Sequence, residues 1–89
     1  MPLQVELFVS PYCTRCHAAR QQLQAAIADL PPGAVQYQEH DVVQHLERAL
    51  EVGVKATPSL AVAGHIMLLA RWDREVLRTL FDQYLRQEH

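Results

Sequence analysis

A chain of 89 residues has room for one small domain that buries about 60% of its unfolded surface, so one sheet with a few helices is expected. Its 49% hydrophobic content, 20% charged content and net charge of −2 argue against disorder and, because there is no basic excess, against a dedicated nucleic-acid binder. No apolar run approaches the roughly 20 residues of a membrane span, and the N-terminal MPLQVELF lacks the features of a secretory signal.

The first elements are predicted from side-chain periodicity. Residues 3–9 (LQVELFV) alternate in part and carry β-branched and aromatic side chains, which favours a strand that the Ser-Pro pair at residues 10–11 ends. Residues 14–30 are mostly good helix formers, with apolar side chains at spacings of three and four. They predict a helix that the Pro-Pro-Gly sequence at residues 31–33 terminates.

The middle of the chain repeats the pattern of strand and helix. Residues 35–41 (VQYQEHD) alternate and predict a second strand. Residues 43–52 predict a short amphipathic helix with Gly53 just beyond its end. Its apolar positions are Leu46, Ala49 and Leu50. Because the two strands flank a helix, they should be parallel with a right-handed crossover.

The last part predicts a hairpin and a helix. Residues 59–63 and 65–69 are two apolar strands with Ala63 and Gly64 at a tight turn, and Asp73 is a credible N-cap for a final helix. The element order is then β-α-β-α-β-β-α over a single domain, residues 1–89. The predicted core consists of Phe8, Leu23, Ile27, Val35, Tyr37, Leu60, Val62 and Phe81.

The two cysteines, Cys13 and Cys16, are too few for a disulfide scaffold and stand three positions apart between a predicted strand and a predicted helix. The positive end of a helix favours a thiolate, and Arg15, His17 and Arg20 add positive charge nearby in sequence. The spacing lets the second thiol resolve a mixed disulfide that the first has made. This context favours a redox-active dithiol.

Three other interpretations of the cysteine pair remain open. Residues 13–17 (CTRCH) match the attachment pattern of haem c, for which Met67 would be a second axial ligand. The two thiolates, with or without His17, are chemically able to bind Zn or Cu(I). A purely structural disulfide is a weak alternative, because closing so short a loop contributes only about 2 kcal/mol.

The sequence resembles the thioredoxin/glutaredoxin superfamily in two separated motifs. One is the strand that runs into the cysteine pair, residues 5–16 (VELFVSPYCTRC), and the other is residues 52–60 (VGVKATPSL), which are similar to the segment around the cis-proline of that superfamily. The short length resembles that of glutaredoxins and of the small glutaredoxin-like thioredoxins. The resemblance implies an α/β thioredoxin-like fold, with a four-stranded mixed sheet and helices on both faces.

The resemblance also implies an activity and a site. The chain would be a thiol-disulfide oxidoreductase in which Cys13 attacks a substrate disulfide and Cys16 resolves the mixed disulfide. Thr57-Pro58 would be a cis peptide, and since proline has no N–H, the preceding backbone would be free to pair with a substrate strand. The implied substrate-binding residues are Tyr12, Thr14, Arg15, Thr57 and Pro58. No metal or bound cofactor is expected beyond the redox-active disulfide.

The chain departs from its relatives at several positions. Thr-Arg separates the cysteines, and Leu7 stands where many thioredoxins have a buried acid. Where glutaredoxins bind glutathione through a Gly-Gly pair and a polar pair, this chain has Ala-Gly at residues 63–64 and Trp-Asp at residues 72–73. The electron donor, a thioredoxin reductase, glutathione or a dedicated partner, therefore stays open.

The expected partners are a disulfide-containing protein and the electron donor, with no nucleic acid and no membrane. The protein is expected to be a cytoplasmic monomer, because a thiol pair of this kind cycles in a reducing compartment. The competing class is a non-enzymatic thioredoxin-fold binder or Zn/Cu carrier. Lys55 is either an anion contact or an ordinary surface lysine, Trp72 is expected to anchor the last helix to the core, and His40 and His45 are not expected to form a metal site.

Overall fold

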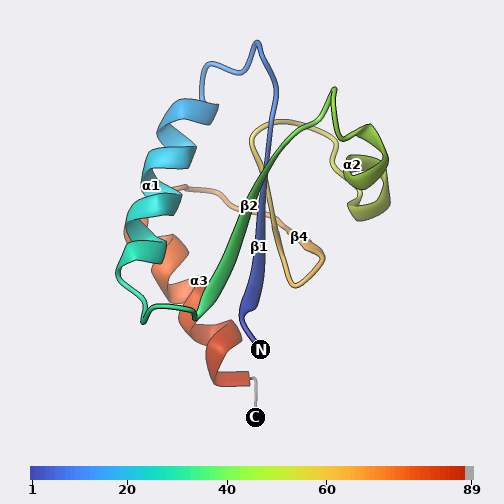
Figure 1. The fold of residues 1–89 in the computed structure, drawn as a ribbon. Coiled ribbons are helices and arrows are strands. Elements are labelled where there is room, and N and C mark those ends of the chain that lie inside the picture. The colour runs from blue at the N-terminus through green and yellow to red at the C-terminus, as the bar shows by residue number, and fades with distance from the viewer. Residues whose placement is uncertain (88–89) are drawn as a thin grey trace.

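The computed structural model describes residues 1–87 and contains the seven elements in the predicted order (Figure 1). They are β1 (Leu3–Val9), α1 (Cys16–Ala28), β2 (Val35–Asp41), α2 (Leu46–Val52), β3 (Ser59–Val62), β4 (His65–Met67) and α3 (Arg74–Gln87). Both strands predicted from alternation have the predicted bounds. Helices α1 and α2 are shorter than predicted, because turns occupy the residues before both of them and α1 ends at Ala28.

The four strands form one mixed sheet in the order β2-β1-β3-β4. Strand β1 is parallel to β2 and antiparallel to β3, which pairs antiparallel with β4. Helices α1 and α3 cover one face of the sheet and α2 covers the other (Figure 1). The structure thus confirms the mixed sheet with helices on both faces. Within residues 1–87, none of the helices has the length and apolar character needed to cross a bilayer.

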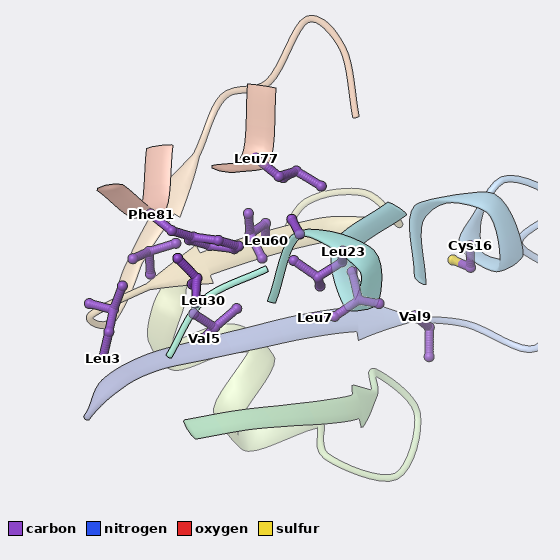
Figure 2. Packing of buried hydrophobic residues seen from close by; sticks show 12 residues of the cluster. Leu3, Val5, Leu7, Val9, Cys16, Leu23, Leu30, Leu60, Leu77 and Phe81 are labelled. Atoms are coloured by element: carbon purple, nitrogen blue, oxygen red, sulfur yellow. The ribbon is translucent and has the colours of Figure 1, made fainter. Parts of the chain in front are cut away.

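The core is divided between the two faces of the sheet. Alternate side chains of β1 enter the larger cluster, where they meet side chains of α1 and α3 (Figure 2). The smaller cluster, under α2, contains Phe8, Ala49 and Ala61. Five of the eight predicted core residues are fully buried, namely Phe8, Leu23, Leu60, Val62 and Phe81. Ile27, Val35 and Tyr37 pack at the margin of the larger cluster, the latter two because β2 is an edge strand.

The hairpin between β3 and β4 has a two-residue loop, Ala63 and Gly64, as predicted. Val62 pairs with His65, and both loop residues have positive φ, 53° and 81°. This is the pattern of a type I′ turn, whose twist matches that of the strands. Both strands are shorter than predicted, because Ala63 belongs to the turn and the chain leaves β4 after Met67.

Replacing Ala63 with asparagine should stabilise the protein by about 0.5–1 kcal/mol, because alanine is strained at positive φ and Asn-Gly is a preferred type I′ pair. For a domain of this size the melting temperature should rise by about 3–6 °C, measured by thermal denaturation followed by circular dichroism. Ala63→Val should lower it, since a β-branched side chain is worse there. A fall for Ala63→Asn would contradict the role assigned to the turn.

Helix α2 differs from the expectation that its apolar residues share a buried face. Ala49 is buried, but Leu46 is 56% exposed and Leu50 is 68% exposed. The helix has only seven residues, and it reaches the smaller core cluster through Ala49 and Val52. Gly53 ends the helix with φ 87°, in the predicted left-handed conformation.

The start of α3 confirms two further predictions. Val76 donates its backbone N–H to Oδ1 of Asp73 at 3.0 Å, so Asp73 caps the helix. This hydrogen bond is the main reason that the pKa of Asp73 lies below its usual value. Trp72 is half-buried and packs against the larger core cluster, where it anchors the segment that leads into α3.

Candidate active site

The cysteine pair lies in the loop that joins β1 to α1. Strand β1 ends at Val9, the amide of Cys13 donates to the carbonyl of Ser10 at 3.2 Å, and α1 begins at Cys16. Cys13 and Cys16 form a disulfide, with 5.4 Å between their Cα atoms. The structure therefore brings the two predicted catalytic residues into covalent contact at the first turn of a helix.

The two cysteines are not equally accessible. Cys13 is half-buried and borders the larger core cluster, whereas Cys16 is only 4% exposed and belongs to that cluster. Figure 2 places the Cys16 side chain at the end of the cluster, beyond Val9 and Leu23. A large molecule approaching this bond therefore meets Cys13 first.

The start of α1 favours a negative charge at the cysteine pair. Helix α1 has neither a side-chain cap at its start nor an acidic residue in its first turn, so its N-terminal amides are free to stabilise an anion. Arg15 and His17 are exposed beside the cysteines. Arg20 does not contribute as the sequence suggested. Its guanidinium forms two hydrogen bonds with the Glu39 carboxylate, at 2.6 and 2.9 Å, which offsets its charge.

The second motif folds against the first. Thr57-Pro58 is a cis peptide, as the resemblance implied. The hydroxyl oxygens of Thr57 and Ser10 lie 3.0 Å apart and share a hydrogen bond, which joins the proline loop to the end of β1. Segments 47 residues apart in sequence thus meet beside the disulfide loop.

Three hollows surround the Thr57-Pro58 loop. The first, about 350 Å³, is the Trp72 cleft, lined by Arg15, Ala18, Ala19, Gln22, Pro58, Leu69 and Trp72. The second, about 500 Å³, is the α2 groove, lined by Ser10, Val42, Val43, Leu46, Ala49, Leu50, Val54, Lys55, Ala56 and Thr57. The third, about 490 Å³, is the hairpin groove, which shares Pro58, Leu69 and Trp72 with the first hollow and Lys55 and Ala56 with the second.

The predicted substrate-binding residues occupy different positions around these hollows. Arg15, Thr57 and Pro58 line them, and Pro58 separates the Trp72 cleft from the hairpin groove. Tyr12 and Thr14 are exposed on the disulfide loop and lie outside the three linings. Their predicted contact with substrate therefore requires a ligand that extends over the loop.

Several side chains named in the alternative interpretations have other partners. The sulfur of Met67, the suggested haem ligand, accepts a hydrogen bond from the Tyr84 hydroxyl at 3.8 Å. The His40 and His45 rings lie 5.1 Å apart, centroid to centroid. Within residues 1–87, no group of three or more His, Cys, Asp or Glu side chains is arranged to hold a metal ion.

Glu6 is a buried acid that the sequence analysis did not single out. It is 4% exposed, and its two carboxylate oxygens accept hydrogen bonds from Nη2 and Nε of Arg48 at 2.7 and 2.8 Å. His40 Nε2 lies 2.9 Å from the carboxylate. These interactions, that of Arg48 above all, hold the pKa of Glu6 below its usual value although burial opposes them.

The carboxylate of Glu6 lies on the face of the sheet opposite to the cysteines. Leu7, the neighbouring residue, enters the cluster that contains Cys16, while Glu6 meets Arg48 of α2 on the other face. Glu6 therefore does not stand in for the buried acid that many thioredoxins have at the position of Leu7. Its role is to attach α2 to the sheet. The presence of a glutamate among the apolar residues of a predicted strand could have indicated a buried acid, but the sequence does not show that Arg48 is its partner.

Comparison with known proteins agrees with this geometry, although no protein-family profile matches the chain. A curated thioredoxin of Methanocaldococcus jannaschii is 29% identical over 75 residues, which cover 84% of this chain and 87% of that protein. Among solved structures, the thioredoxin of Malassezia sympodialis is similar with a TM-score of 0.74 and 24% identity, over 93% of this chain and 75% of the other.

The fold also occurs within larger proteins. The zinc-bound form of human ERp44 is similar with a TM-score of 0.77 and 15% identity, over 93% of this chain but only 26% of that protein. This chain thus spans about a quarter of ERp44, and the likeness concerns the fold. The fold, the paired cysteines and the curated relative together make this chain similar to proteins of the thioredoxin/glutaredoxin superfamily.

Proposed function

We propose that this protein is a thiol-disulfide oxidoreductase that reduces disulfides by dithiol exchange through Cys13 and Cys16. The observation that carries the proposal is the disulfide between a partly buried Cys13 and a buried Cys16 at the start of α1. A bond placed for structural support has no need of one cysteine that is more exposed than the other at the positive end of a helix.

The reaction balances as two successive exchanges. The Cys13 thiolate attacks one sulfur of the substrate disulfide, and the other substrate sulfur leaves as a thiolate that takes up a proton. Cys16 then loses its proton and attacks the Cys13 sulfur, which releases the second substrate thiol. The substrate gains two electrons and the protein becomes the disulfide form, which an external thiol reductant must reduce before the next cycle.

The proline loop would present the substrate to Cys13. Pro58 has no N–H, so the Thr57 backbone is available to an extended segment that adds to it as a strand. The Ser10–Thr57 hydrogen bond fixes this loop relative to the cysteine loop. Tyr12, Thr14 and Arg15 would contact the same segment from the disulfide loop.

Insulin reduction tests the proposal. The reduced protein should accelerate the precipitation of insulin chains by dithiothreitol, and its Cys13→Ser variant should not, because the attacking thiol is then missing. Turbidity measured with time gives the rate. The oxidoreductase activity would be excluded if insulin precipitated no faster with wild type than with dithiothreitol alone and if a small disulfide were likewise reduced no faster.

The same preparation distinguishes the metal-carrier alternative. Protein purified under reductant should exchange thiols and carry less than one equivalent of metal by mass spectrometry. Stoichiometric zinc or copper without thiol exchange would instead indicate a carrier. Mixing the oxidised protein with either a thioredoxin reductase system or glutathione then identifies the electron donor. Trapping of the thiol state in cells tests the proposed cytoplasmic location, where the cysteine pair should be largely reduced.

A further inference from the structure

The positive side chains near the site lack the carboxylate partners that most others have. The chain has eight Lys and Arg residues, and five of them form ion pairs, namely Arg20, Arg48, Arg71, Arg74 and Arg78. Arg15 and Lys55 form none with any residue between 1 and 87. Both line the hollows around Thr57-Pro58, so two uncompensated positive charges lie there.

The same hollows are free of acidic residues. The chain has more Asp and Glu than Lys and Arg, ten against eight, yet no described residue in the linings of the three hollows is a carboxylate. A concave region with one sign of charge raises the local concentration of ligands of the opposite sign. The charge distribution therefore favours an acidic ligand at this site.

An apolar surface borders these charges. Val43 is 71% exposed, and Leu46 and Leu50, one turn apart on α2, are 56% and 68% exposed. All three line the α2 groove together with Lys55 and Thr57. Arg48, on the same short helix, forms ion pairs with Glu6 and Glu51. Exposed aliphatic side chains gathered in one groove mark an interaction site more often than scattered ones do.

We propose that the preferred substrate is an extended segment of a partner protein in which the disulfide cysteine is flanked by an aliphatic residue and an acidic residue. The aliphatic side chain enters the α2 groove, and the acidic side chain pairs with Lys55 at the edge of that groove. This inference rests on the proposed function. A second copy of the chain is a poorer occupant, because it would bring its own Arg15 and Lys55 towards the same positive region.

Peptides with one cysteine, linked as a mixed disulfide to 2-mercaptoethanol, test the two flanking positions separately. The reduced protein is given peptides in which Leu or Ser lies on one side of the cysteine and Glu or Lys on the other, in both orders. Changing Glu to Lys should lower kcat/KM by about three- to fivefold, less so in 1 M salt. Changing Leu to Ser should lower it by about tenfold.

Variants of the protein assign each preference to its residue. Lys55→Glu should reverse the preference for Glu over Lys, and Leu50→Ser should remove the preference for Leu over Ser. Arg86→Glu makes the same change of charge near the end of α3, at the opposite end of the molecule from the disulfide loop (Figure 1), and should alter neither. Thermal unfolding verifies that each variant folds.

Bis(2-hydroxyethyl) disulfide, which is neutral and has no flanking residues, separates the possible failures. If wild type does not reduce it, the proposed function fails and the inference fails with it. If wild type reduces it but treats all peptides alike, only the substrate preference is wrong. Sedimentation of the oxidised protein measures its oligomeric state. A dimer that the Leu50→Ser substitution dissociates would show that a second copy of the chain binds in the α2 groove, which would overturn the proposal.

Discussion

Cys13→Ser should abolish disulfide reduction, whereas Cys16→Ser should complete the first exchange and then stop as a mixed disulfide with its substrate. The reason is the difference in accessibility between the two residues, since Cys13 is half-buried at the surface and Cys16 is 4% exposed within the core. Only Cys13 can meet an incoming disulfide, and only Cys16 is positioned to release the product.

The measurement is a single turnover without external thiol. Each variant is reduced, freed of reductant, mixed with a disulfide substrate and analysed by mass spectrometry under non-reducing conditions. Wild type should return as the intramolecular disulfide, Cys16→Ser should carry the mass of one substrate half, and Cys13→Ser should remain unmodified.

A matched control is the exposed α1 residue Gln24, whose replacement with alanine should behave as wild type. An adduct on Cys13→Ser would contradict the order of attack. It would mean that the residue buried in the structure is the more accessible thiol in the reduced protein.

Patterns within a few residues predicted the fold well. Alternation located β1 and β2 to the residue, because a strand shows its two faces at every second position. The turn at Ala63-Gly64 and the cap at Asp73 were also readable, since each depends on the chemistry of one or two side chains. The cysteine pair and the cis peptide followed from motifs that resemble those of a superfamily.

Features that depend on distant partners were not readable. The burial of Glu6 requires Arg48, 42 residues further along the chain. The exposure of Leu46 and Leu50 was hidden for a related reason, because helical periodicity identifies an apolar face without showing whether anything covers it. For Arg20, too, no local pattern indicated the Glu39 carboxylate that accepts its hydrogen bonds.

Arg48→Met should destabilise the protein by about 2–3 kcal/mol, because it leaves the Glu6 carboxylate buried beside His40 alone. Breaking a fully buried ion pair costs about 3–5 kcal/mol. The smaller value is expected because the Arg48 side chain is 37% exposed and His40 Nε2 stays within 2.9 Å of the carboxylate. Urea denaturation measures the change, and Arg20→Met, which removes a more exposed pair, should cost about 1 kcal/mol or less.

The double variant Glu6→Leu/Arg48→Met distinguishes a buried charge from a lost contact. Because both charged groups are removed, it should recover most of the stability that Arg48→Met loses. Failure to recover would show instead that α2 is attached to the sheet chiefly by packing of the Arg48 side chain.

The dependence on pH follows from the direction of the Glu6 shift. Hydrogen bonds, that from Arg48 first, lower the pKa of Glu6 in the folded protein from its ordinary value of 4.5. A group with a lowered folded pKa contributes stability above its unfolded pKa and loses it as pH falls through the folded value. The stability of wild type should therefore fall, relative to that of the double variant, as the pH drops below about 4.5. A difference that persists unchanged at pH 3 would mean that the carboxylate charge does not hold α2 to the sheet.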